Sequence, residues 1–168
     1  DDKINWYENG NSWNATTITS SADRAYDVYA ADMDGDGDID VLSASNNDGK
    51  IVWYENGNSW NATTITSTAS GARSVYAVDL DGDGDMDVLS ASTGDDKINW
   101  YENGNSWNAT TIASGEDGFG QFPRSVYAAD LDGDGDMDVL SASTWDDKIA
   151  WYENGNSWNA TTITSSAD

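Results

Sequence analysis

Internal repetition is the feature of this sequence that most constrains its fold. A block reading Trp-Tyr-Glu-Asn-Gly-Asn-Ser-Trp-Asn-Ala-Thr-Thr-Ile occurs four times and starts at Trp6, Trp53, Trp100 and Trp151. The starts are separated by 47, 47 and 51 residues, and an acidic block recurs with the same 47- and 51-residue spacings. A period in the forties is typical of arrays of small structural units that stack on one another. We therefore predict a tandem-repeat fold.

Each repeat contains four short runs rich in β-branched and aromatic residues. In one repeat these runs are 75–78, 87–92, 97–102 and 107–112. Such runs predict strands, and no pattern with a helical period competes with them. Between the third and fourth runs, Asn103-Gly104 predicts a two-residue type I′ turn, because both residues tolerate positive φ. Four strands in 47 residues predict a small antiparallel sheet whose aromatic faces must pack on neighbouring sheets.

The fold class that follows is all-β. We predict a β-propeller built from four-stranded antiparallel blades, with about three and a half blades per chain. The expected units are a half blade at 1–23, blades at 24–70 and 71–117, and a blade at 118–168 with a preceding insertion around 115–123. Propellers usually have four to eight blades. The chain is therefore a fragment of a longer array, a dimer with strand exchange, or a subunit that assembles head to tail into a filament.

The acidic block carries the strongest chemical signal. Its first copy, 32–40, has carboxylates at loop positions 1, 3, 5, 7 and 9 and Gly at position 6, where the chain must turn sharply. Hard oxygen ligands on a tight loop suit Ca²⁺, which takes six to eight oxygens. We predict three calcium sites, in which position 7 contributes its backbone carbonyl. The site residues are Asp32, Asp34, Asp36, Asp38 and Asp40, then Asp79, Asp81, Asp83, Asp85 and Asp87, then Asp130, Asp132, Asp134, Asp136 and Asp138.

Other readings of the acidic loops fit less well. Mg²⁺ prefers a strict octahedron and keeps its waters. An EF-hand needs Glu at position 12, where this chain has Ser43, Ser90 and Ser141. A solvated loop without metal is the remaining alternative, but five carboxylates in nine residues repel one another strongly without a cation.

Composition excludes several classes of function. Seven Lys and Arg against 31 Asp and Glu give a formal charge of −24, which argues against nucleic acid and anionic membranes as partners. The absence of His and Cys removes thiol catalysis, the common zinc sites and histidine triads. No apolar run approaches the length of a membrane span, so we predict no membrane insertion. Nine Trp and eight Tyr argue against a disordered acidic chain.

The aromatic residues allow two interpretations. Trp6, Tyr7, Trp13 and their copies are natural packing between blades, although aromatic faces can also stack on sugars. Trp145 has no counterpart in the other repeats and is the better candidate for an exposed contact. Four Asn-Ala-Thr sequons could carry glycans in a secretory route, or could simply be polar residues of an edge strand. They start at Asn14, Asn61, Asn108 and Asn159.

Catalysis has little support in the sequence, and we predict that the chain is not an enzyme. An active site needs a distinct constellation that breaks the repeat. The useful departures from the repeat are few: Arg24, Asp27, Glu116, Asp117, Gln121 and Trp145.

The run 124–143, which contains the third acidic loop, and the Asp-Asp-Lys-Ile-Ala-Trp-Tyr-Glu-Asn run at 146–154 resemble the FG-GAP/VCBS family of repeats. The similarity extends over essentially the whole chain. It implies an integrin-α-like propeller with Ca²⁺ between the first two strands of each blade. Members occur in secreted and surface proteins, including adhesins, propeller lectins and some polysaccharide lyases. The family's Phe-Gly signature before the fourth strand is replaced here by Asn-Ser-Trp, so no member's ligand site carries over.

These observations support two functional hypotheses. In the first, the chain is a calcium-binding extracellular or cell-surface module for adhesion or carbohydrate binding, with a glycan or surface protein as partner. In the second, it is a structural subunit that self-associates as a dimer or head-to-tail assembly and binds no specific small ligand. A polysaccharide lyase-type enzyme is a distant third.

Overall fold

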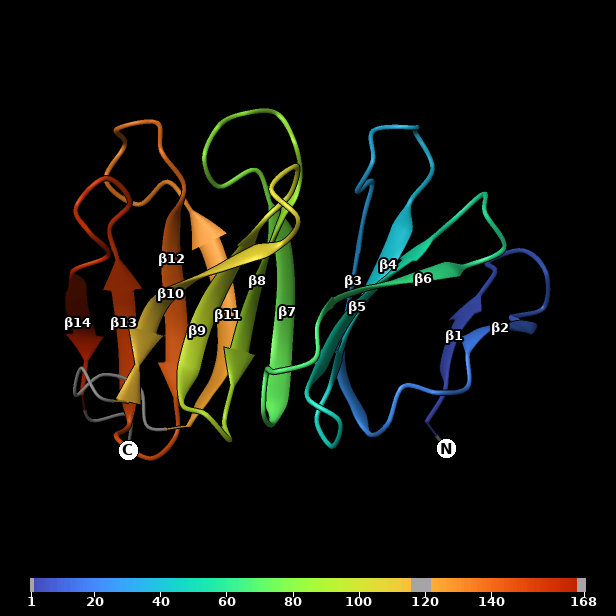
Figure 1. The fold of residues 1–168 in the computed structure, drawn as a ribbon, viewed down its shortest axis with the longest axis horizontal. Helices are drawn as coiled ribbons and strands as arrows, with labels where there is room; N and C mark the ends of the chain where they lie inside the picture. Colours follow the sequence, from blue (N-terminus) through green and yellow to red (C-terminus); the bar gives the residue numbers. More distant parts are fainter. Residues whose placement is uncertain (1, 116–121, 166–168) are drawn as a thin grey trace.

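The computed structural model describes residues 2–115 and 122–165, which form one two-stranded and three four-stranded antiparallel sheets (Figure 1). Consecutive strands pair within every sheet, so each sheet is a meander. The strands are β1 Ile4–Tyr7, β2 Ala15–Thr19, β3 Ala25–Ala31, β4 Asp40–Ser45, β5 Lys50–Glu55, β6 Asn61–Thr66, β7 Ala72–Val78, β8 Asp87–Ser92, β9 Lys97–Glu102, β10 Asn108–Ser114, β11 Pro123–Ala129, β12 Asp138–Ser143, β13 Lys148–Tyr152 and β14 Ala160–Thr164.

The four sheets lie side by side along the long axis of the molecule, with β1–β2 at one end and β11–β14 at the other (Figure 1). Strand β7 contacts both β3 and β11, so the first strands of the three complete sheets are neighbours. Their tyrosines form a ladder, in which the ring of Tyr76 lies 4.7 Å from the rings of both Tyr29 and Tyr127. The predicted all-β class and four-stranded antiparallel sheets are confirmed. The arrangement is propeller-like and open.

Apolar side chains from facing sheets build the core. Leu42 and Ile51 of the β3–β6 sheet pack with Val75, Val88 and Tyr101 of the β7–β10 sheet, and the repeat generates an equivalent cluster between β7–β10 and β11–β14. A smaller cluster joins the β1–β2 sheet to β3–β6. Each sheet is thus too thin to bury its own faces and depends on its neighbours.

The repeated tryptophans lie at these sheet-to-sheet contacts. Trp53 meets Trp107 of the next sheet edge to face, with ring centroids 6.4 Å apart, and Trp100 meets Trp158 in the same way. Packing between blades, the interpretation favoured from the sequence, is therefore confirmed for the complete sheets. In the two-stranded sheet the same positions are exposed: Trp6, Tyr7 and Trp13.

The turn predicted at Asn103-Gly104 is wrong. Strand β9 ends at Glu102 and pairs with Asn108, so the connection has five residues instead of two. Gly104 has positive φ as expected, but the other left-handed residues are Ser106 and Trp107. The longer turn removes Trp107 from the strand that was predicted to begin there, and this places its ring against Trp53.

Equivalent valines measure what a neighbouring sheet contributes to stability. Val75 is 2% exposed, whereas Val28 at the same repeat position is 53% exposed, because the two-stranded sheet lacks the inner strands that would cover it. We expect Val75→Ala to lower the free energy of unfolding by about 1.5–3 kcal/mol and Val28→Ala to change it by less than about 0.5 kcal/mol. Urea denaturation of both variants checks this, and equal losses would contradict it.

Among the described residues there is no helix of the length and apolarity needed to cross a membrane. Part of the predicted insertion, including Gly118-Phe119-Gly120, lies outside the described residues, as do Glu116, Asp117 and Gln121.

Candidate metal sites

The three acidic blocks form the connections between the first two strands of each complete sheet. They join β3 to β4, β7 to β8 and β11 to β12, and all three project from the same edge of the molecule, at the top of Figure 1. Their first-strand to second-strand placement agrees with the expectation from the sequence.

The first carboxylate of each loop folds the loop around itself. Asp32 accepts the backbone N–H of Gly35 on Oδ1 at 2.8 Å and that of Gly37 on Oδ2 at 3.0 Å. Both glycines have positive φ, 74° and 93°, a conformation that costs a residue with a Cβ. The same pair of hydrogen bonds is made by Asp79 and Asp130. The sharp turn predicted at position 6 is therefore present in every copy.

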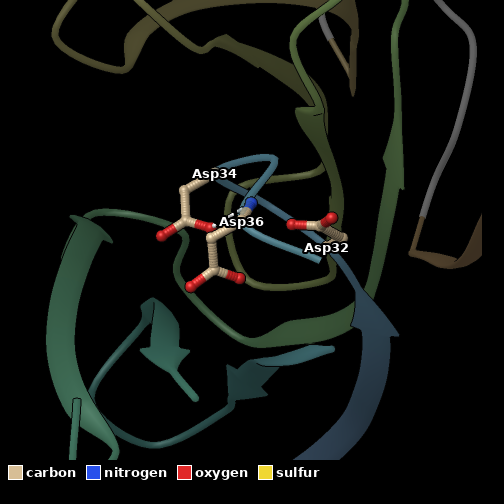
Figure 2. Close-up of side chains that lie close together, drawn as sticks. All are labelled: Asp32, Asp34 and Asp36. Carbon is tan, nitrogen blue, oxygen red and sulfur yellow. Dashed lines mark hydrogen bonds between the residues drawn. The ribbon is translucent and has the colours of Figure 1, made fainter. Parts of the chain in front are cut away.

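This turn brings carboxylates together. Figure 2 shows Asp32, Asp34 and Asp36 from one loop, with the backbone N–H of Asp36 bonded to Oδ1 of Asp34 at 3.2 Å. Each loop offers three carboxylate oxygens that lie within 4.8 Å of one another. Such a set of hard oxygen donors can hold a divalent cation. The triplets are Asp32, Asp34 and Asp36; Asp79, Asp81 and Asp83; and Asp130, Asp132 and Asp138.

Position 9 differs from the other carboxylates because it is buried. Asp40, Asp87 and Asp138 are each 1% exposed. In Asp87, Oδ2 accepts the N–H of Leu80 at 3.2 Å and Oδ1 accepts that of Asn103 at 2.8 Å. Asp40 and Asp138 make the equivalent bonds. Position 9 therefore fastens the start of its loop to the following hairpin, and only Asp138 also belongs to a carboxylate triplet.

Position 7 stays outside the triplets. The side chains of Asp38, Asp85 and Asp136 are exposed, and the N–H of Asp38 donates to Oδ1 of Asp36 at 2.8 Å. The role of the position 7 backbone carbonyl as a ligand stays a prediction.

The crowding of carboxylates changes their acidity. Loss of hydration raises the pKa of Asp34, and the charges of Asp36, Asp40 and Glu55 raise it further. The pKa of Asp81 is raised in the same way. For Asp132, the hydrogen bond from the Asp134 N–H has the largest effect and lowers the pKa, but desolvation and neighbouring negative charges outweigh it. Burial raises the pKa of Asp87 in spite of its two backbone hydrogen bonds.

These raised pKa values predict opposite effects of acid with and without a cation. In chelator, the folded chain binds more protons than the unfolded chain above the ordinary Asp pKa of 3.8, so stability should rise as the pH falls from neutral towards that value. With saturating calcium, protons compete with the cation and stability should fall over the same range. Melting temperatures measured in both series check this. Parallel slopes would contradict it.

From the sequence, the asparagine at the end of the Trp-Tyr-Glu-Asn block was considered only as a turn residue and was given no role at the acidic loops. Asn103 Nδ2 donates to the carbonyl of Met86 at 3.1 Å and to that of Met33, in the preceding loop, at 3.3 Å. Asn154 bridges Met137 and Leu80 in the same way. The side chain thus ties neighbouring acidic loops together. Its strict recurrence in the block was the one signal that could have identified it.

Two of the residues that depart from the repeat have structural partners. Asp27 Oδ2 accepts the N–H of Val75 in the next sheet at 3.1 Å. The Arg24 guanidinium donates to the hydroxyl of Tyr26 at 3.1 Å. Trp145 is 71% exposed, as expected, and its ring lies 5.4 Å from that of Phe122.

The sheets and loops define a class of protein: a tandem-repeat, all-β protein that carries an acidic, glycine-hinged loop at the same place in each complete sheet. The family model of the FG-GAP-like repeat matches residues 32–90 and 79–141, which together are well over half of the chain. The chain belongs to the FG-GAP-like repeat family. A comparison with curated proteins found no match.

Proposed function

We propose that the chain is a calcium-binding repeat module of a β-propeller that works outside the cell or at its surface. The observation that carries the proposal is the triplet of carboxylate oxygens within 4.8 Å in each of three loops. Oxygen-only donor sets of this kind suit Ca²⁺, and FG-GAP repeats are a calcium-binding type of repeat.

The bound cation would act on a loop that its own residues have already shaped. In the first two loops, positions 1, 3 and 5 would supply carboxylates, and in the third loop positions 1, 3 and 9 would do so. Position 7 would supply a carbonyl, and position 9 holds the base of every loop. Calcium would supply positive charge where these carboxylates repel one another. Asn103 and Asn154 link adjacent loops, so binding in one loop would also stiffen its contact with the next sheet.

Calorimetric titration tests the calcium sites. Chain stripped with chelator should bind about three Ca²⁺, and Asp79→Asn combined with Asp81→Asn should remove one of them. Magnesium should bind at least tenfold more weakly, since it resists losing its waters. The proposal would be contradicted if calcium gave no heat of binding, or if the double variant bound as many Ca²⁺ as the unchanged chain.

For the binding role, we propose adhesion or carbohydrate recognition, with a glycan or surface protein as partner. Trp145 and Phe122 support it, because they form an exposed aromatic pair that is not required for packing between the sheets. The four sequon asparagines are exposed at the start of the outermost strands, where glycans would not disturb the core. A glycan screen in millimolar calcium should give a hit that Trp145→Ala abolishes.

The proposal includes no catalytic activity. Turnover of acidic polysaccharides by the chain would contradict this part of the proposal.

The second candidate function is that of a self-assembling structural subunit. It is favoured by large apolar side chains that are exposed in this structure, among them Trp13 at 63% and Ile163 at 55%.

A further inference from the structure

The tyrosine ladder, formed by Tyr29, Tyr76 and Tyr127, brings three phenol rings into contact across three sheets. The ring centroid of Tyr76 lies 4.7 Å from that of Tyr29 and 4.7 Å from that of Tyr127, with interplanar angles of 55° and 49°. We propose that the ladder is a site of oxidative cross-linking, at which a dityrosine bond joins the first strands of neighbouring sheets. The oxidant that this modification needs is a peroxide that acts through one-electron steps.

The ladder is built by the repeat. Each of its tyrosines pairs with the leucine of the second strand in its own sheet, so the three rings occupy the same register. The first strands are also edge strands of their sheets. Tyr76 has a complete sheet on either side and is still only half-buried, so a small oxidant reaches it within the array.

The contact distinguishes these three tyrosines from the other five. The chain has eight tyrosines, all of which lie among the described residues. Within that part of the chain, ring contacts between tyrosines occur in the ladder alone. Tyr54, Tyr101 and Tyr152 are buried singly, Tyr7 is exposed, and Tyr26 lies against guanidinium groups. A reaction that joins two phenols within one chain is therefore directed to the ladder.

Hydrogen bonds between the first strands hold the rings in place. Asp27 Oδ2 accepts the N–H of Val75 at 3.1 Å, and Ser74 Oγ accepts the N–H of Val126 at 3.4 Å. Both bonds cross from one sheet to the next, and each donor residue directly precedes a tyrosine of the ladder. Groups that are held in contact react far more efficiently than groups that must meet by diffusion.

The rings also meet at the ends that react. Loss of hydration, followed by the hydroxyls of Tyr127 and Tyr29, raises the pKa of Tyr76, so the three hydroxyls lie near one another. A dityrosine bond joins ε carbons, and each ε carbon is bonded to the carbon that carries the hydroxyl. Rings whose hydroxyl ends are close therefore present the reacting carbons to each other.

The reaction balances without any group from the chain other than the two phenols. Each tyrosine gives up one electron and its hydroxyl proton and becomes a phenoxyl radical. The two radicals form a bond between their ε carbons, and the hydrogen on each of these carbons then moves to the ring oxygen. Two hydrogen atoms are lost in all. Hydrogen peroxide takes up the two electrons and two protons and leaves as two water molecules.

Such a bond would act on this chain as a disulfide acts on others. The chain has no Cys, and its sheets are held together by apolar clusters and a few hydrogen bonds. A bond between Tyr29 and Tyr76 would join positions 47 residues apart. A cross-link over a loop of this length stabilises the folded state, chiefly by restricting the unfolded chain.

Brief oxidation of the dilute chain by persulfate, a peroxide, with a photoexcited ruthenium complex as the one-electron mediator tests the proposal. We expect a product of monomer mass that lacks two hydrogen atoms and has dityrosine fluorescence. Cleavage after Lys and Arg leaves Tyr76 as the sole tyrosine of peptide 74–97. That peptide should be recovered joined to 25–50 or to 125–148.

Tyr76→Phe removes the tyrosine that both contacts share and should lower the yield of dityrosine within the chain at least about 10-fold. The variant retains the ring, so the fold should persist, and near-ultraviolet circular dichroism checks that. Tyr7→Phe is the matched control, because Tyr7 is exposed and has no tyrosine against it, and its yield should equal that of the unchanged chain.

The cross-linked monomer should also melt at least about 5 °C above Tyr76→Phe oxidised in the same way, a comparison that cancels damage to Trp and Met. Equal melting temperatures would show that the bond does not tie the sheets together. Dityrosine that forms only between chains, that maps to tyrosines outside the ladder, or that persists in Tyr76→Phe would overturn the proposal. Calcium titration succeeds or fails independently of these results.

Discussion

Removing calcium should lower the melting temperature of the chain by about 15–30 °C. At a calcium concentration 100-fold above the dissociation constant, each site stabilises the folded state by about 2.7 kcal/mol. The three proposed sites would together contribute roughly 8 kcal/mol, and a domain of this size gains about 2–4 °C for each kcal/mol. The gain is large because 31 acidic residues are offset by only seven basic ones, which leaves a formal net charge of −24.

Differential scanning calorimetry in a calcium series and in chelator measures this shift. The melting temperature should rise with the logarithm of calcium concentration, as binding linkage requires. Magnesium at the same concentration is the control for simple charge screening and should give a much smaller shift. A melting temperature that ignores chelator would remove the basis of the calcium proposal while leaving the sheet fold untouched.

The repeat made most of the fold predictable. Strands β8 and β9 fall at the residues expected from composition, 87–92 and 97–102, because β-branched and aromatic runs bounded by turn residues recur in every copy. The β-hairpin turn after Glu102 was not predictable from Asn-Gly alone. The left-handed Ser-Trp pair of the longer connection recurs in all four blocks, including the block of Trp13, whose ring is exposed. The longer connection is therefore a property of the whole block, which the Asn-Gly pair alone does not reveal.

The sequence predicted that the carboxylates of each acidic loop cluster, but it did not predict which carboxylate has which structural role. Spacing placed oxygens at positions 1, 3, 5 and 9 without distinguishing them. In the structure Asp79 arranges the loop through two glycine N–H groups, whereas Asp87 is buried and holds two backbone segments together. Burial depends on the hairpin that follows 16 residues later, at Asn103. A nine-residue motif does not contain that information.

The exposed tryptophans illustrate the same limit. Trp13 and Trp107 occupy equivalent places in identical blocks, yet one is exposed and the other packs on a neighbour. Sequence identity predicts the same local structure for both. The position of each sheet in the array decides which one finds a partner.

Because position 9 is buried and position 7 is exposed, we expect Asp87→Ala to lower the free energy of unfolding much more than Asp85→Ala does. Asp87 is 1% exposed and accepts the N–H groups of Leu80 and Asn103. Its loss leaves two backbone donors without an acceptor, at about 1–3 kcal/mol each. Relief of the buried charge, whose pKa is raised by burial, offsets part of this, so we expect a net loss of about 3 kcal/mol. Asp85 is exposed, and its truncation should cost less than about 0.5 kcal/mol.

Urea denaturation in chelator and in saturating calcium separates the two roles of Asp87. In chelator, the difference between the two variants reports the lost backbone hydrogen bonds less the relief of the buried charge, because no cation contributes. Any additional loss in calcium measures what the Asp87 carboxylate contributes to binding. If the loss is the same in both conditions, position 9 acts as a fastener of the loop and the cation is held by Asp79, Asp81 and Asp83. If the two variants are equally stable in chelator, the buried carboxylate is not the structural centre of the loop, and the hydrogen bonds from Leu80 and Asn103 contribute little to its stability.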